Sequence, residues 1–70
     1  MDPSWEYVER QQDFLKQVIQ GFFRGKKQTI EQDDALQIAS LAAYTAHKSF
    51  DPNREATVDS YVAICVRNAL

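Results

Sequence analysis

Cys65 and His47 are the two side chains whose chemistry could support nucleophilic catalysis, with a thiolate attacking and an imidazole taking the proton. Their predicted positions argue against this pair. Cys65 falls on the apolar side of a predicted helix, where a free cysteine behaves as a small hydrophobic residue. His47 falls on the polar side of another helix, where a solvated or interface histidine is expected. One cysteine and one histidine also cannot fill a four-ligand zinc site.

Asp33 and Asp34 form a carboxylate pair that could in principle perform acid–base chemistry. Neighbouring residues of a helix point about 100° apart, so the two carboxylates cannot converge on one substrate. Their place in the first turns of a predicted helix is better explained by the favourable interaction of negative charge with the helix dipole. The sequence also lacks a glycine-rich phosphate loop and metal-ligand spacing. We therefore expect no enzyme activity, no metal and no cofactor.

The composition predicts one small globular domain. The 70 residues are 44% apolar and 26% charged, and eight basic against ten acidic residues give a net charge of −2. This balance argues against a free-standing protein that binds nucleic acid through phosphate contacts. The sequence has no apolar run of membrane-spanning length and no signal-peptide pattern, so we expect a cytoplasmic protein without a membrane partner. Because so short a chain has a small core, association with a partner is expected to add stability.

The first helix is predicted over residues 3–24. Asp2 is a suitable N-cap, and Pro3 is tolerated at the first helical position. The apolar stripe has i, i+3, i+4, i+7, i+8 spacing and contains Leu15, Val18, Ile19, Phe22 and Phe23. Gly21 costs about 1 kcal/mol relative to alanine inside a helix, which suggests that it permits a close helix crossing. Gly25 is the expected residue just past the helix end.

A second helix is predicted over residues 30–50, after a capping box at 29–32. At about 1.5 Å per residue it is roughly 30 Å long, which makes it the central element. The face expected to be buried contains Leu36, Ala39, Ala43, Ala46 and Phe50, widened by Ala35 and Ala42. The opposite face, which we call the polar arc, contains Asp33, Gln37, Ser40, Tyr44, His47 and Lys48, with Ile38 and Leu41 on its flanks.

A turn is predicted over residues 51–55, because Pro52 cannot continue the helix. A third helix then spans 58–70, with Thr57 or Asp59 as the N-cap. Its apolar side is expected to contain Val58, Tyr61, Cys65 and Ala69. Strand-like alternation and hairpin turns are absent from the sequence. The predicted fold is therefore all-α, a small bundle of three main helices with a long central second helix, forming a single domain over residues 1–70.

The polar arc permits two interpretations, a solvated face or a protein-binding surface. Its centre is nearly uncharged, it contains the aromatic Tyr44, and apolar residues flank it. Polar, aromatic surfaces with charges at their margins are typical of protein interfaces. The helices alone therefore predict an interaction module. Binding through this surface requires that the arc is not covered by the chain's own helices.

Three motifs in the second half of the sequence occur in the order helix, turn, helix. They are Asp34 with Gln37, then Phe50, Asp51, Pro52 with Arg54, and finally Tyr61, Arg67 with Ala69. Without a gap, they match the patterns D-L-x-Q-E-G, F-D-P-x-R-G and x-x-F-x-x-Y-A-x-x-x-I-R-x-A-I. The stretch from Asp34 to Leu70 therefore resembles region 2 of bacterial sigma factors of the sigma-70 family, which direct RNA polymerase to promoters. Residues 15–24 resemble the preceding helix of that family more loosely.

The resemblance implies that the second helix docks on the clamp helices of the RNA polymerase β′ subunit. Position by position, the contacts would fall on Asp33, Asp34, Gln37, Ile38, Ser40 and Tyr44. The family's Glu-Gly pair corresponds to Ile38 and Ala39, so one charged contact becomes apolar. The family's DNA-facing pair, often aromatic, corresponds to Ile64 and Cys65, which cannot stack on bases. Contacts to promoter DNA are therefore expected to be weak, with Arg54 and Arg67 as the candidates.

We hypothesise a transcription initiation module that binds the polymerase core. It would be either a fragment of a complete sigma factor or one subunit of a split sigma factor that works with a second sigma-like subunit. One alternative is a regulator that occupies the clamp and blocks or redirects other sigma factors. Another is a self-associating helical module of a phage or mobile element. An anti-sigma factor is a further candidate partner.

Overall fold

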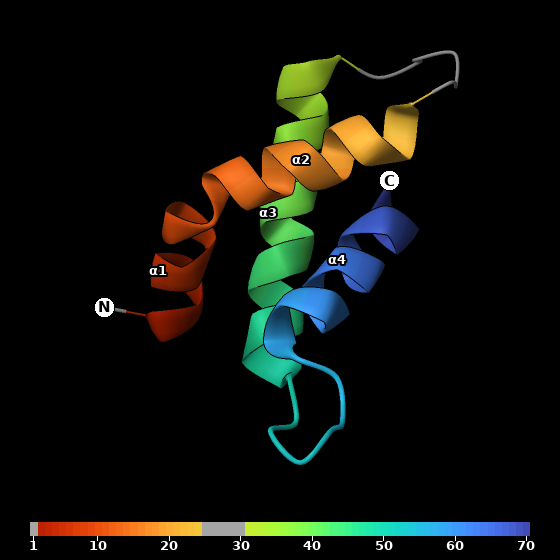
Figure 1. Cartoon of the computed structure of the whole chain (residues 1–70). Coiled ribbons are helices and arrows are strands. Elements are labelled where there is room, and N and C mark those ends of the chain that lie inside the picture. The colour runs from red at the N-terminus through yellow and green to blue at the C-terminus, as the bar shows by residue number, and fades with distance from the viewer. Residues whose placement is uncertain (1, 25–30) are drawn as a thin grey trace.

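Four helices make up the computed structural model of the chain, which describes residues 2–24 and 31–70 (Figure 1). They are α1 (Pro3–Arg10), α2 (Gln12–Phe23), α3 (Gln32–Ser49) and α4 (Val58–Ala69). The described ranges contain no strand. The all-α class is therefore confirmed, as is the long second helix of the prediction, which is α3. The prediction of one continuous helix over 3–24 is wrong, because the chain bends at Gln11.

The bend at Gln11 separates two helices that bury different residues. The Gln11 backbone leaves helical geometry, with φ −100° and ψ 21°, while its N–H donates to the carbonyls of Tyr7 and Val8. The Gln12 side-chain amide also donates to the Val8 carbonyl, at 3.1 Å. The bend allows Tyr7 and Val8 of α1 and the buried residues of α2 to pack on the same central helix. Polar residues at the bend are consistent with its place at the surface.

Helix α3 packs against each of the other three helices and forms the centre of the bundle (Figure 1). The predicted face is confirmed for its four most buried alanines, Ala35, Ala39, Ala43 and Ala46, each at most 3% exposed. Small side chains allow neighbouring helices to approach closely. The largest fully buried side chains come from the surrounding helices and are Val8, Leu15, Ile19, Val62 and Val66.

Helix α4 presents a different side to the core from the one predicted. Val62 and Val66 are fully buried, whereas Tyr61 and Cys65 are half-buried and Ala69 is exposed. Two valines four residues apart form a compact ridge that fits against the small residues of α3. The helix is therefore rotated toward these valines, and the predicted stripe lies along the edge of the contact.

The helix ends confirm two of the predicted caps. The Asp2 carboxylate accepts from the Ser4 backbone N–H at 3.0 Å, and the Thr57 hydroxyl accepts from the Ser60 N–H at 3.2 Å. Helix α3 begins after Glu31, which makes no side-chain capping bond. The predicted capping box starts at Thr29, which lies outside the described residues, as does Gly25.

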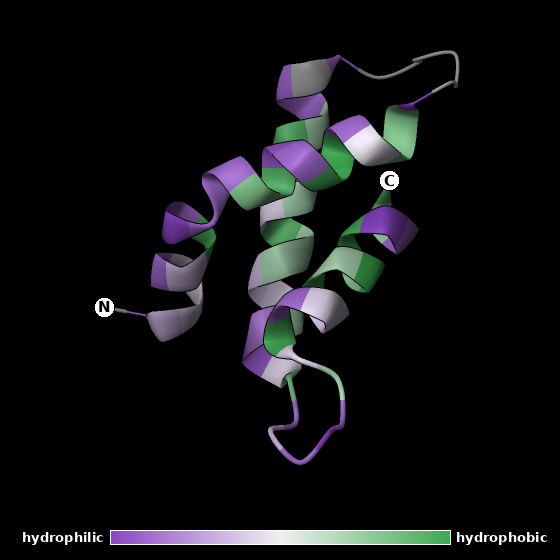
Figure 2. Cartoon of the chain, viewed as in Figure 1, coloured by the Kyte–Doolittle hydropathy of each residue, from purple (hydrophilic) through white to green (hydrophobic). Residues whose placement is uncertain are grey.

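Gly21 does not permit a close helix crossing, contrary to the prediction. It is exposed, and a Cβ built on it meets no atom within 4 Å. In the hydropathy colouring, purple and green segments alternate along α2, as expected for a helix with one polar and one apolar face (Figure 2). In the described ranges, no helix has both the length and the apolar character needed to cross a membrane.

Candidate docking surface on helix α3

Helix α1 covers most of the C-terminal half of the polar arc and leaves Lys48 exposed. The His47 ring stacks on the Tyr7 ring, with centroids 4.5 Å apart, and its Nδ1 atom lies 2.9 Å from the Ser4 hydroxyl. Tyr44 and Ser40 are half-buried. The expectation that the arc is not covered by the chain's own helices is therefore wrong for this half. His47 is therefore a packed residue of the α1–α3 interface, which is one of the two environments expected for it.

Tyr44 joins the first residues of the chain to α3. Its hydroxyl donates to the Asp2 carboxylate and accepts from the Lys48 ammonium at 3.3 Å. The hydrogen bond from Tyr44, followed by that from the Ser4 backbone, lowers the pKa of Asp2. The same tyrosine raises the pKa of Lys48. The Trp5 and Tyr44 rings also form a T-shaped contact, with centroids 5.8 Å apart. Tyr44 therefore positions the start of α1.

Tyr7 links the first helix, α1, to the last helix, α4. Its ring is 4% exposed, and its hydroxyl donates to the Asp59 carboxylate of α4 at 2.5 Å. Burial, followed by the bond to this carboxylate, raises the pKa of Tyr7. Because α1 and α4 do not pack directly against each other, this side-chain bond is a direct link between them.

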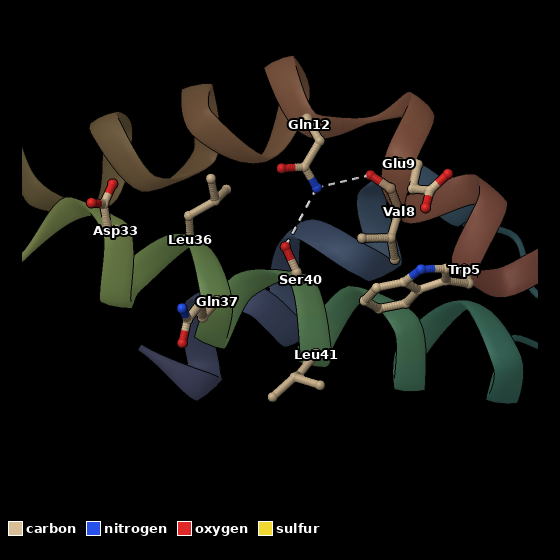
Figure 3. A pocket seen from close by; sticks show the side chains of 9 residues that line it. All are labelled: Trp5, Val8, Glu9, Gln12, Asp33, Leu36, Gln37, Ser40 and Leu41. Atoms are coloured by element: carbon tan, nitrogen blue, oxygen red, sulfur yellow. Dashed lines mark hydrogen bonds between the residues drawn. The ribbon is translucent and has the colours of Figure 1, made fainter.

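The N-terminal half of the polar arc is open. Its residues Asp33 and Gln37 are exposed, as is the neighbouring Asp34, and Ile38 is half-buried beside them. Among the described residues, the Gln37 amide has no hydrogen-bond partner, and Figure 3 shows this side chain pointing away from α2. The predicted contact residues therefore divide into an open group and a covered group, Ser40 and Tyr44.

A groove of about 640 Å³ lies between the open half of the arc and the α1–α2 bend (Figure 3). It is lined by Trp5, Val8, Glu9, Gln12, Asp33, Leu36, Gln37, Ser40 and Leu41, and we call it the Trp5 groove. The Gln12 amide bridges its two walls, because it donates to Val8 on one side and to the Ser40 hydroxyl, at 3.4 Å, on the other. This bridge fixes the groove's shape.

A second groove, of about 490 Å³, lies between α3 and α4. Its lining residues are Ile38, Leu41, Ala42, Thr45, Ala46, Ser49, Tyr61, Cys65 and Ala69. Leu41 lines both grooves and is 64% exposed, so it forms the ridge between them. Cys65 faces this groove while His47 faces α1, so the structure does not form the Cys–His pair. In the described part of the chain, no group of three His, Cys, Asp or Glu residues could hold a metal.

The two candidate DNA-binding arginines lie at opposite ends of α4. The Arg54 guanidinium, in the loop before α4, lies 4.8 Å from the centre of the Tyr61 ring, and Phe50 contacts the same ring with centroids 5.7 Å apart. Arg67 is exposed in the last turn of α4. The helix between them has 12 residues, roughly 18 Å at 1.5 Å per residue, so the two arginines do not form one basic patch.

The loop geometry gives the F-D-P-x-R motif a structural role as well. The Asp51 carboxylate accepts from the Asn53 N–H at 2.9 Å, and the Arg54 N–H donates to the Asp51 carbonyl at 3.0 Å. These bonds form the predicted turn and place Arg54 over Tyr61. The spacing of the motif therefore places Arg54 against the Tyr61 ring, near the start of the last helix.

A model of the sigma-70 region 2 family matches residues 7–70. The chain belongs to this family. No curated protein and no solved structure matches the chain. The chain is thus a sigma-factor-like module of transcription initiation, and the family as a whole interacts with the RNA polymerase core. Sigma region 2 is a non-enzymatic domain of transcription factors.

Sequence reasoning missed the residues that precede the matched range of this sigma region 2 domain. Trp5 and Asp2 lie before residue 7, yet both contact Tyr44. A signal was present, because Ser4, Tyr7 and Val8 have i, i+3, i+4 spacing and form a face that is half polar. Such a face fits another half-polar face, and α3 offers one at Tyr44 and His47.

Proposed function

We propose that this sigma region 2 domain binds the RNA polymerase core through the clamp helices of the β′ subunit. The observation that carries the proposal is that the open half of the polar arc coincides with the positions where the family pattern places its core contacts. These positions are Asp33 and Gln37 of the arc and the adjacent Asp34, all exposed on α3. Ile38 adds an apolar contact at the margin. Ser40 and Tyr44 support this surface indirectly, because Ser40 holds Gln12 in place and Tyr44 holds the start of α1 in place.

Charge supports this proposal. Asp33 and Asp34 are two exposed carboxylates in the first turn of α3, and they would attract a basic surface. Interactions between exposed charges weaken as salt screens them over about 10 Å at 0.1 M. Binding is therefore expected to weaken between low and physiological salt. Arg54 and Arg67 remain proposed DNA contacts, each acting separately because α4 lies between them.

The test is a binding titration of the purified chain with a β′ clamp-helix fragment, followed by calorimetry. Gln37→Ala and Asp33→Ala should each weaken binding by about 1–3 kcal/mol, the range of a central interface residue. Gln20→Ala on α2 and Glu55→Ala in the loop before α4 are the matched controls, because both residues are exposed and neither lines the Trp5 groove. Equal losses in all four variants would contradict the proposed surface.

A transcription assay distinguishes initiation from regulation. If the chain initiates, with or without a second sigma-like subunit, adding it to core polymerase should increase transcription from its promoter. If it instead blocks or redirects other sigma factors, adding it to polymerase that already carries one should reduce their transcripts. Gln37→Ala should weaken either effect in proportion to its loss of affinity for the clamp fragment.

A further inference from the structure

Exposed apolar side chains concentrate at the Trp5 groove. Three large hydrophobic residues are exposed in the described chain, Trp5 at 44%, Leu41 at 64% and Ile64 at 53%. Trp5 and Leu41 both line this groove, whereas Ile64 lies on α4. Single exposed hydrophobic residues need no explanation, but neighbouring ones around a concave surface mark a binding site.

The groove has an apolar interior and acidic margins. Val8 and Leu36 lie between the two helix walls, and the Trp5 ring reaches from α1 toward α3 (Figure 3). The charged residues in its lining are Glu9 on α1 and Asp33 on α3, and both are acidic and exposed. An occupant that complements these features has an apolar side chain for the interior and basic groups on either side.

The walls of the groove also determine the kind of backbone that can bind. Both walls are α-helices, and beyond the first turn of α3 their backbone N–H and C=O groups are bonded within the helix, so an extended strand would find no ladder to join. Recognition must then come from side chains that fit between the helices. A helix that inserts one apolar face into such a groove is a common mode of protein recognition.

We propose that the Trp5 groove binds a basic amphipathic helix, with Trp5 and Leu41 gripping its apolar face and Glu9 and Asp33 pairing with its basic residues. This inference deepens the proposed function and rests on it, because the helix is then one of the polymerase clamp. It adds α1 to an interface otherwise assigned to α3. Trp5 belongs to α1 and lies before the residues that the family model matches.

Tyr44 gains a positioning role under this proposal. Its ring forms a T-shaped contact with the Trp5 ring and its hydroxyl donates to Asp2, so it holds the tryptophan at the end of the groove. Tyr44→Phe keeps the ring contact and removes the hydroxyl bond. It should therefore retain most of the affinity for a helical peptide, while Tyr44→Ala should reduce it together with a shift in Trp5 emission of the free protein.

The first experiment uses the fluorescence of Trp5, which is the only tryptophan in the sequence. The probes are two tryptophan-free helical peptides, one of leucine and lysine and one of leucine and glutamate in the same positions. The basic peptide should shift the Trp5 emission to shorter wavelength, and the acidic peptide should not. Glu9→Gln combined with Asp33→Asn should weaken the response at least fivefold. No response to the basic peptide, or equal responses to both peptides, would overturn the inference.

The second experiment separates this inference from the proposed function. Trp5→Ala and Leu41→Ala should each weaken binding of the β′ clamp fragment at least tenfold, while Ile64→Ala, the matched exposed residue on α4, should change it less than twofold. Tight binding that is unaffected by Trp5→Ala and Leu41→Ala would overturn the inference and leave the proposed function intact. A groove that binds the basic peptide while the clamp fragment does not bind would contradict the polymerase partner alone.

Discussion

At the scale of single residues, Tyr7 combines three contacts that hold three helices together. Its ring is buried in the core, it stacks on His47 of α3, and its hydroxyl donates to Asp59 of α4. A buried tyrosine needs a partner for its hydroxyl, and a carboxylate is a strong one. The side chain therefore joins apolar packing with a directed bond between the first and last helices.

Replacing Tyr7 by phenylalanine should lower the free energy of unfolding by about 1.5–3 kcal/mol, the typical contribution of a hydrogen bond to a charged group. The same residue predicts alkaline sensitivity. Its pKa is raised above the ordinary 10.0, so its contribution is complete below pH 10 and is lost as the pH rises further. Urea unfolding at pH 8 and pH 11 measures both effects.

The Tyr7→Phe variant also serves as the control for the alkaline sensitivity. It should lose less stability between pH 8 and pH 11 than the unaltered chain, because phenylalanine does not titrate. An identical loss in both proteins would mean that other groups cause the alkaline sensitivity. Asp59→Asn provides a second check, since it keeps a hydrogen-bond acceptor but removes the charge that helps to raise the pKa of Tyr7.

At the scale of elements, α3 brings its neighbours close by means of small side chains. Ala39 and Ala43 are fully buried one turn apart, and α1, α2 and α4 all pack against this helix. A core at native density has no room for additional methyl groups. The alanine face of α3 therefore sets how closely the surrounding helices approach.

Ala43→Val should destabilise the domain by about 1–3 kcal/mol, because the added methyl groups force helices apart. Ala69→Val is the control, because it makes the same change at an exposed position in the last turn of α4. Thermal unfolding followed by circular dichroism measures both variants. Equal destabilisation would show that valine lowers stability through helix propensity and not through packing.

The sequence allowed the prediction of α3 in detail but not of α1. The alanines of α3 repeat with helical periodicity, and the motifs from Asp34 to Arg67 keep the spacing of a known family, so both face and family could be identified. The bend at Gln11 has no glycine or proline to mark it. It forms because two short helices can each pack on α3, which is a tertiary effect that local patterns do not reveal.

The candidate surface was predicted only in part for a similar reason. Asp33 and Gln37 are exposed as expected, because polar residues at the start of a helix need no partner. Tyr44 and His47 are polar residues that are nevertheless packed, since Asp2, Ser4 and Tyr7 provide hydrogen bonds and an aromatic ring. Whether a polar aromatic residue faces water or another helix depends on that partner, which lies at least 40 residues away in the sequence.

At the scale of the whole molecule, the domain has a small core and is expected to be only marginally stable. A single core in a chain of this length rarely supplies more than about 3–5 kcal/mol. A partner that binds only the folded state adds about 2.7 kcal/mol when its free concentration is 100 times the dissociation constant. Docking should therefore change the stability of the domain substantially.

Adding the β′ clamp fragment at that excess should raise the unfolding temperature by roughly 10 °C or more, since 1 kcal/mol corresponds to about 4–8 °C in a domain of this size. The Gln37→Ala variant should show a smaller rise at the same fragment concentration. Differential scanning fluorimetry with an external dye reports both. An unchanged unfolding temperature would contradict docking on the folded surface.

The bond between Tyr7 and Asp59 also constrains when the domain can be completed during synthesis. Tyr7 is translated 52 residues before its acceptor. Until α4 has emerged from the exit tunnel, the tyrosine hydroxyl has no carboxylate partner and Val62 and Val66 are missing from the core. The nascent chain should therefore acquire protease resistance in one late step, and ribosome stalling before Asp59 should leave α1 open to cleavage.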